Sequence, residues 1–273
     1  MNAGSTLRAL GAHPQKTGPR LAVAFALLLA APATVLAAGC GSQSGSGSAS
    51  STITVFAGAS LVDAFTKIGD QFTAAHPDVN VRFSFAGGPD LVTQVRQGAP
   101  ADVLATGDLV NMRKVADLVG EPQPFARNKV EIVVEPGNPR GVTSLKDLAN
   151  PDLKVVLGAP AISAGQVTTE VLDEQGISVE PVSLEDNVKG VVTKVSLGEA
   201  DAGIAWVTDV SAAAGKVEGV QIPDAENATS TYPIAVVRSS KNARDAQAFV
   251  DYVLSAAGQQ VLRAYGFMPP SGP

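Results

Sequence analysis

The sequence predicts an α/β fold with two lobes, in which mixed, mostly parallel sheets carry helices on both faces. Short runs of β-branched and aromatic residues alternate with segments whose apolar residues recur at helical spacing, which is typical of βαβ units. A block of about 100 residues has its own strands and helices and lies between the turn-rich stretch "EPGNPRG" and the return strand "YPIAVV". Two chain crossings between lobes create a cleft, where α/β proteins hold their ligands.

Each predicted element follows from a local pattern. The first half contains the strand "TITVFA", a helix from Ser60 to about His76, the strand "VNVRFSFA", a helix to Gln97, the strand "ADVLAT", a helix opened by Asp108 and the strand "NKVEIVVEP". The second half contains the strand "LKVVLGAP", helices from about Ala164 and over 185–197, the strands "DAGIAWV" and "YPIAVVR", and a helix in "NARDAQAFVDYVLSA". We expect the first lobe over 52–134, completed by 235–273, and the second lobe over 135–234.

Residues 1–39 have the pattern of a secretion signal. Three basic residues and no acid precede an apolar run that ends in small residues before Cys40. The stretch "AAGC" resembles a lipobox, in which the cysteine carries lipid and becomes the first residue of the mature chain. Residues 40–51 then form a Gly/Ser tether. We expect an extracytoplasmic protein with a lipid anchor at Cys40 in the cell membrane; an unmodified cysteine beside an ordinary cleavage site is the alternative.

Composition excludes several classes of function. From Cys40 onward the chain has 17 Lys and Arg against 26 Asp and Glu, so a nucleic-acid partner is excluded. Its one histidine there, His76, stands beside Pro77 at a helix end, without a Cys or His partner for a metal. Asp102 and Asp108 are predicted to cap a strand and a helix. The alternative class of function is a hydrolase or transferase on a similar fold. The sequence disfavours it, because it offers no pair of a general base and a nucleophile. No catalytic or metal-binding residue and no cofactor is therefore assigned.

Three strand-to-helix junctions, "AGAS", "FAGGPDL" and "ISAGQV", are built from small residues and neutral hydrogen-bond donors. Ser60 and Asp63 have the spacing of a capping box, so Ser60 either caps its helix only or also presents its hydroxyl to a ligand. Gly87 and Gly88 either make a tight turn with positive φ or expose backbone N–H groups. Ala164 begins a helix or an ordinary loop. Together the junctions predict an anion site made of neutral donors and helix dipoles.

The chain resembles the substrate-binding proteins of molybdate ABC transporters over nearly all of residues 52–268. The motifs that carry the resemblance are "ITVFAGASL", "FSFAGGPDL", "GAPADVLATGD", "EDNVKGVVTKVSLGEADAGIAWVTD", "YPIAVV" and "YGF", in that order. The resemblance implies a type II periplasmic-binding-protein fold that binds molybdate or tungstate. It also implies a monomer that delivers this small oxyanion to the membrane permease of an ABC importer.

The resemblance implies five ligand-binding positions: the Ser60 hydroxyl, Gly88, the backbone amides of Ala164 and Val188, and Trp206. Gly88 stands where the family has a serine, and Trp206 stands where it has a tyrosine. These two departures leave open another tetrahedral oxyanion, namely sulfate, phosphate or a small phosphorus or sulfur acid. Trp206 is alternatively a core aromatic. A pocket wall that offers only hydrogen-bond donors would reject hydrogen phosphate, whose proton needs an acceptor. Asp90 is the nearest candidate acceptor in the sequence, and we expect its side chain to face solvent.

Overall fold

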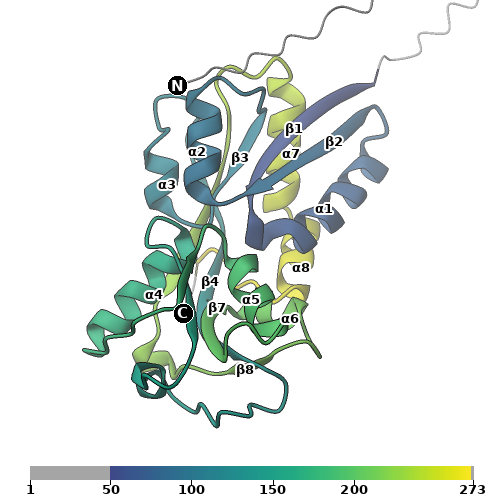
Figure 1. Ribbon diagram of the computed structural model, residues 1–273. Coiled ribbons are helices and arrows are strands. Elements are labelled where there is room, and N and C mark those ends of the chain that lie inside the picture. The colour runs from purple at the N-terminus through teal and green to yellow at the C-terminus, as the bar shows by residue number, and fades with distance from the viewer. Residues whose placement is uncertain (1–49, 272–273) are drawn as a thin grey trace, which may run out of the picture. The chain divides into compact units, whose positions relative to one another are not determined.

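The computed structural model describes residues 50–271, which form a mixed sheet with helices packed on its faces (Figure 1). The strands are β1 (Ser51–Gly58), β2 (Val79–Ala86), β3 (Val103–Ala105), β4 (Gln123–Val134), β5 (Val155–Gly158), β6 (Ser183–Glu185), β7 (Ala202–Trp206), β8 (Glu218–Val220) and β9 (Thr229–Val236). The α-helices are α1 (Val62–Ala75), α2 (Gly88–Arg96), α3 (Leu109–Arg113), α4 (Ser163–Glu174), α5 (Val188–Ser196), α6 (Val207–Ala212), α7 (Ala243–Leu254) and α8 (Ala256–Ala264). Short 3-10 helices are η1 (Ala59–Leu61), η2 (Leu145–Ala149) and η3 (Asp224–Glu226).

The strand order is β2-β1-β3-β9-β4-β7-β5-β6, and β8 pairs with β4. Parallel ladders join β1 to β2 and β3, and join β5 to β6 and β7. Every antiparallel ladder among the described strands includes β4 or β9. The first part of β4 pairs with β9, and its last part, from Val130, pairs with β7. We call β2, β1, β3, β9 and the start of β4, with the helices and loops that pack on them, the first sheet half. The second sheet half is the end of β4 with β5, β6, β7 and β8 and the helices and loops that pack on them, including α4, α5 and α6.

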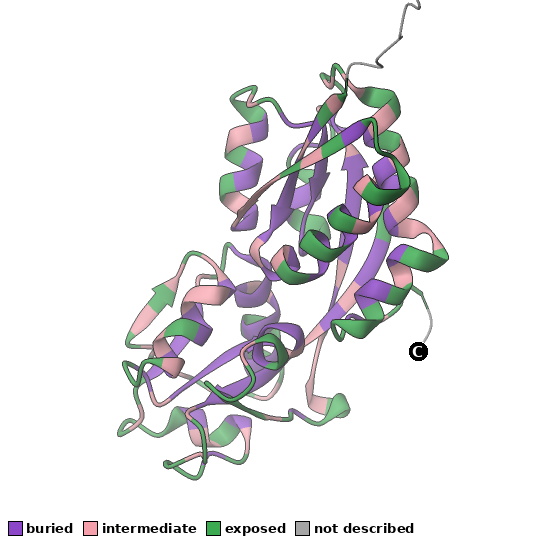
Figure 2. Ribbon diagram, turned by 90° about the vertical axis from the view of Figure 1, so that its right-hand side faces the viewer, coloured by how far each residue is buried: buried purple, intermediate pink, exposed green. Residues whose placement is uncertain are grey.

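Alternation along the strands creates a core on each face of the first sheet half. In β1, Ile53 and Val55 belong to one apolar cluster and Phe56 belongs to the other, because successive side chains point to opposite faces. Helices α1, α7 and α8 cover one face, where the rings of Phe65 and Phe249 lie 6.1 Å apart. Helices α2 and α3 cover the other face. Figure 2 shows the buried residues along the strands and the inner sides of these helices.

The predicted α/β class and the order of most elements are confirmed. The sequence patterns missed β6, β8, α6 and α8. Strands β6 and β8 have three residues each and none is buried, so they lack the apolar run that marks the equally short β3. Helix α6 continues directly from β7 without a turn signal. Helix α8 follows α7 after only Ser255, whose extended backbone (ψ 164°) interrupts the helix and whose side chain accepts a hydrogen bond from the Gly258 N–H. The predicted helix from Glu185 begins instead at Val188.

The predicted signal peptide, Cys40 and nearly all of the predicted tether lie outside the described residues. Between residues 50 and 271, no helix combines the length and apolar character needed to cross a membrane. The lobe boundaries near 134 and 235 stay a prediction.

Gly165, in the first turn of α4, provides a test of the local packing. A Cβ there would lie 2.0 Å from the Ala159 carbonyl oxygen and 2.6 Å from that of Gly158. Helix propensity alone makes Gly165→Ala stabilising by about 1 kcal/mol, but this backbone clash predicts a loss of about 1–3 kcal/mol in urea unfolding. Gly120→Ala is the control, since its Cβ would meet the nearest atom at 3.5 Å. A Gly165→Ala protein as stable as the wild type would contradict this packing.

Candidate functional site

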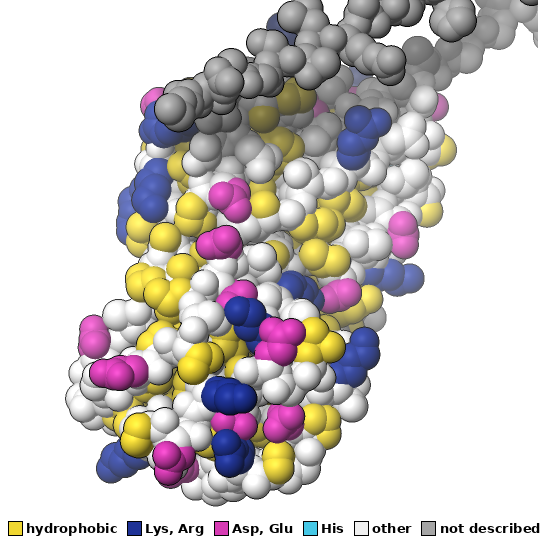
Figure 3. Space-filling view, in the orientation of Figure 1, with side chains coloured by type: hydrophobic (Ala, Val, Ile, Leu, Met, Phe, Trp, Pro, Cys, Tyr) yellow, Lys and Arg dark blue, Asp and Glu magenta, His cyan; other side chains and the backbone are white. Residues whose placement is uncertain are grey.

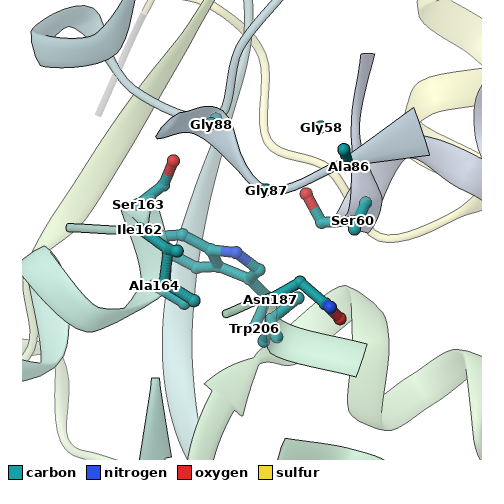
Figure 4. Close-up of a pocket in the computed structure, with 13 residues that line it drawn as sticks. Gly58, Ser60, Ala86, Gly87, Gly88, Ile162, Ser163, Ala164, Asn187 and Trp206 are labelled. Carbon is teal, nitrogen blue, oxygen red and sulfur yellow. The ribbon is translucent and has the colours of Figure 1, made fainter. Parts of the chain in front are cut away.

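A small pocket of about 30 Å³ lies where the two sheet halves meet (Figure 4). Such a volume has room for a ligand of only a few atoms. Both sheet halves contribute to its wall, and none of the lining side chains is charged. The lining residues are Gly58, Ala59, Ser60, Ala86, Gly87, Gly88, Gly107, Ile162, Ser163, Ala164, Asn187, Val188 and Trp206. The five predicted ligand-binding positions therefore all line one pocket.

Three helices of nine or more residues, α2, α4 and α5, begin at this pocket. Their preceding residues, Gly87, Ile162 and Asn187, all line it. The N–H groups of a first helical turn have no partner within the helix, and the helix dipole adds positive partial charge there. Neutral backbone groups therefore make the pocket favourable for an anion.

Ser60 does not cap its helix, so the capping-box prediction is wrong. It lies inside η1, and the residue that precedes α1 is Leu61, without a side-chain cap. The Ser60 hydroxyl instead lies 3.2 Å from the hydroxyl of Tyr232, and either can donate. Tyr232 is fully buried, and burial raises the pKa of its phenol far above the ordinary value. When Tyr232 donates to Ser60, the Ser60 hydrogen is left for the pocket.

Gly87 and Gly88 are required by close approach and not by a special turn. The φ of Gly87 is −64°, and neither residue has positive φ, so the tight-turn prediction is wrong. A Cβ at Gly87 would lie 2.4 Å from the Asp186 carbonyl oxygen in the second sheet half. A Cβ at Gly88 would lie 2.7 Å from Asn111 Nδ2. The missing side chain of Gly87 therefore lets the two sheet halves approach each other at the pocket, while that of Gly88 leaves room for Asn111 of α3.

Ala164 and Val188 occupy the first turns of α4 and α5, where their amides are free of intrahelical bonds. Trp206 precedes α6 and is 1% exposed. Its ring packs edge-on against Tyr232 with a centroid distance of 5.8 Å, while Figure 4 shows its indole between Ala164 and Asn187. Trp206 is thus both a core aromatic and part of the pocket wall. Asp90 is exposed and does not line the pocket, as expected.

Sequence reasoning missed Ser163, Asn187 and Tyr232. Asn187 accepts a hydrogen bond from the Gly190 N–H and so fixes the start of α5. Ser163 lines the pocket and donates to Asp108 Oδ2. The predicted structural roles of two aspartates are confirmed: Asp102 accepts from the Thr54 N–H at 2.7 Å, and Asp108 caps α3. In the sequence, Ser163 directly precedes Ala164 in "ISAG", and its polar hydroxyl next to a predicted ligand position could have identified it as a pocket residue.

The lysine next to the pocket is neutralised by two carboxylates. Lys189 Nζ lies 3.0 Å from Asp209 Oδ1 and 3.1 Å from Asp63 Oδ2, so it connects α5 to α6 and to α1. Asp209 is buried, and its Oδ2 has no hydrogen-bond partner among the described residues. On the face shown in Figure 3, acidic and basic side chains are interspersed and gather into no large patch of one sign. The pocket therefore depends on local dipoles.

Most of the chain matches a known protein family. Residues 53–268 match the family model described as bacterial extracellular solute-binding protein. The chain is 44% identical over 221 residues to the molybdate-binding protein ModA of Mycobacterium tuberculosis, an alignment that spans 80% of this chain and 85% of that protein.

Two solved structures share the fold. The periplasmic molybdate-binding protein of Azotobacter vinelandii superposes with a TM-score of 0.71 at 19% identity, covering 80% of this chain and 100% of that chain. The sulfate-binding protein SubI of Mycobacterium tuberculosis gives a TM-score of 0.71 at 21% identity, covering 80% and 87%. The predicted periplasmic-binding-protein-like fold is confirmed.

The buried ion pair predicts a pH dependence of stability. Burial raises the pKa of Asp209 to about 6 from an ordinary value of 3.8, against the opposing effect of Lys189. Between these pH values the folded state binds more protons than the unfolded state. The contribution of Asp209 is therefore fully present below about pH 4 and is lost as pH rises through about 6. Asp209→Asn abolishes this change, which is on the order of 3 kcal/mol.

Urea unfolding at a series of pH values checks this expectation. The free energy of unfolding of Asp209→Asn should rise relative to the wild type between about pH 4 and about pH 7. The exposed Asp173→Asn is the control and should stay parallel to the wild type. A constant difference between Asp209→Asn and the wild type across this range would rule out the titration.

Proposed function

The chain belongs to the bacterial extracellular solute-binding proteins, which are transport proteins and not enzymes, and we propose that it binds molybdate or tungstate for an ABC importer. The observation that carries this proposal is the small uncharged pocket at the starts of α2, α4 and α5. The 44% identical relative named as a molybdate-binding protein supports the choice of ligand. The partner that receives the ligand is the membrane permease of the importer.

A tetrahedral metal oxyanion matches this pocket chemically. Its oxygen atoms are acceptors, and the pocket offers N–H groups of three helix starts and the hydroxyl of Ser60. We assign ligand contacts to Ser60, Gly88, Ala164, Val188 and Trp206, which all line the pocket. Gly88, Ala164 and Val188 donate through the backbone. Trp206 donates through its indole N–H. The metal is part of the transported ligand, and no resident cofactor is assigned.

Gly88 and Trp206 favour a second candidate, another tetrahedral oxyanion such as sulfate or phosphate. Gly88 has an amide but no hydroxyl, and an indole donates from a different position than a phenol does. A lost hydrogen bond to a charged ligand costs about 1.5–3 kcal/mol. These two positions therefore contribute to how strongly the pocket prefers one oxyanion over another.

Two lobes, 52–134 with 235–273 and 135–234, are proposed to close around the ligand. Polar contacts across the sheet halves support this proposal. Asn111 Nδ2 lies 3.4 Å from the Ala161 carbonyl oxygen, and Lys189 Nζ lies 3.1 Å from Asp63 Oδ2. These contacts lie beside the pocket, so the surfaces that would meet on closure are also those that surround the ligand.

The protein is proposed to act as an extracytoplasmic monomer with a lipid anchor at Cys40. The basic, acid-free leader over 1–39 and the stretch "AAGC" support signal cleavage and lipidation. The Gly/Ser tether over 40–51 would hold the folded domain away from the cell membrane.

Ligand identity is tested by titrating the purified protein with molybdate, tungstate, sulfate and phosphate, measured by calorimetry and by fluorescence. We expect molybdate and tungstate to release heat and to change the emission of Trp206, the only tryptophan of the chain. The indole lines the pocket, so a ligand there changes its surroundings. No response to molybdate at micromolar concentration would refute the proposal, and a response to sulfate alone would favour the second candidate.

Ser60→Ala tests the hydroxyl donor. Molybdate affinity should fall about 10- to 100-fold, because one hydrogen bond to a charged ligand is lost. The melting temperature should fall modestly as well, because the buried Tyr232 hydroxyl loses its Ser60 partner, a loss of about 1–3 kcal/mol in the free energy of unfolding. Ser240→Ala is the matched control: its hydroxyl donates to Asp102 Oδ1 at 2.5 Å, away from the pocket. It should lower stability and leave affinity unchanged. Equal affinity losses in both variants would show that Ser60 has no ligand contact.

A further inference from the structure

We infer that Ser163, oriented by Asp108, gives the pocket a hydrogen-bond acceptor and thereby admits tetrahedral oxyanions that carry a proton, such as hydrogen phosphate. The inference rests on the proposed oxyanion site and extends its range of ligands. It also corrects the sequence-based expectation of a wall that only donates.

Ser163 is the first residue of α4, in the second sheet half, and is 8% exposed. It lines the pocket directly beside Ala164. Figure 4 shows its hydroxyl pointing toward Gly88, the position at which the family serine is missing. A polar side chain that is not among the five predicted contacts therefore faces the pocket.

The partner of Ser163 determines the direction of its hydrogen. Asp108, in the first sheet half, caps α3 and accepts from the Asn111 N–H at 2.5 Å and from Asn111 Nδ2 at 2.8 Å. Its Oδ2 also accepts from the Ser163 hydroxyl. A carboxylate only accepts, and a serine hydroxyl has a single hydrogen. The Ser163 hydrogen therefore points at Asp108, and the oxygen lone pairs remain for the pocket.

The surrounding packing holds this arrangement. Asn111 is fully buried, and Lys114 Nζ donates to its Oδ1 at 3.0 Å, so the amide NH₂ is turned toward Asp108. A Cβ at Gly107 would lie 2.8 Å from Ser163 Oγ, and a Cβ at Gly88 would lie 2.7 Å from Asn111 Nδ2. Glycine at both positions makes room for the Ser163–Asp108–Asn111 chain of hydrogen bonds.

The acceptor changes which oxyanions fit. A proton-free oxygen placed against Ser163 meets a lone pair with a carboxylate behind it, which is repulsive. An oxyanion with one O–H group donates that hydrogen to Ser163, while its other oxygens accept from the helix starts and from Ser60. Hydrogen phosphate can both donate to Ser163 and accept from the helix starts and Ser60, whereas sulfate and molybdate can only accept. Ser163 thus favours a protonated oxyanion and weakens the binding of proton-free ones.

Phosphate and sulfate are the probes that separate these effects. At about pH 8, above the second pKa of a phosphate group, phosphate is a dianion with one hydrogen and sulfate a dianion with none. We compare the purified wild type, Ser163→Ala, Asp108→Asn and Ser60→Ala by calorimetry with phosphate, sulfate and molybdate. Ser60→Ala is the control, because a lost donor weakens phosphate and sulfate alike.

Ser163→Ala should lower the affinity for phosphate relative to sulfate by about tenfold and should bind molybdate more tightly than the wild type. Asp108→Asn should shift the ratio in the same direction, because an amide can donate to Ser163 and release its hydrogen toward the pocket. If Asp108→Asn does not fold, Ser163→Ala alone decides the question.

The outcomes separate this inference from the proposed function. A wild type that binds molybdate but not phosphate overturns the inference and leaves the proposed function intact. So does a Ser163→Ala protein in which phosphate, sulfate and molybdate all weaken equally, since Ser163 would then be an ordinary donor. A wild type that binds none of the three overturns both.

Discussion

The site depends on the attraction between an anion and the backbone N–H groups at the starts of α2, α4 and α5. Strands β2, β5 and β6 each lead into one of these helices, and the residues that precede the helices, Gly87, Ile162 and Asn187, all line the pocket. The pocket contains no charged side chain, and the adjacent Lys189 is held by Asp63 and Asp209. An anion there is balanced by backbone dipoles, which lose no side-chain entropy when a ligand binds.

Such a site needs backbone to approach backbone, and this requirement explains the small residues at the junctions. A Cβ at Gly87 would meet the carbonyl of Asp186 at 2.4 Å, across the seam. A Cβ at Gly165 would meet the carbonyl of Ala159 at 2.0 Å, within the second sheet half. Neither glycine has positive φ. Their role is to leave space, so that three helix starts can surround a cavity only a few atoms wide.

Local patterns in the sequence predicted most strands, the main helices and the three small-residue junctions, because these depend on neighbours within a few residues. Val188 and Trp206 were implied as pocket positions by the family resemblance alone. The hydrogen-bond partners were not predictable in this way. Ser60 pairs with Tyr232, 172 residues later, and Ser163 pairs with Asp108, 55 residues earlier. The capping-box spacing of Ser60 and Asp63 was misleading, because η1 intervenes before α1 and moves the helix start past Ser60. Tertiary contacts decide what a side chain in a local motif does.

The two pocket serines show why the partner matters more than the residue type. Ser60 lies beside a phenol, which can donate to it and leave its hydrogen for the ligand. Ser163 lies beside a carboxylate, which only accepts and so takes that hydrogen away from the ligand. Opposite sides of one small cavity therefore present a donor and an acceptor from the same amino acid. The Ser163–Asp108 hydrogen bond also joins the two sheet halves, so the group that discriminates between ligands forms only where the halves meet.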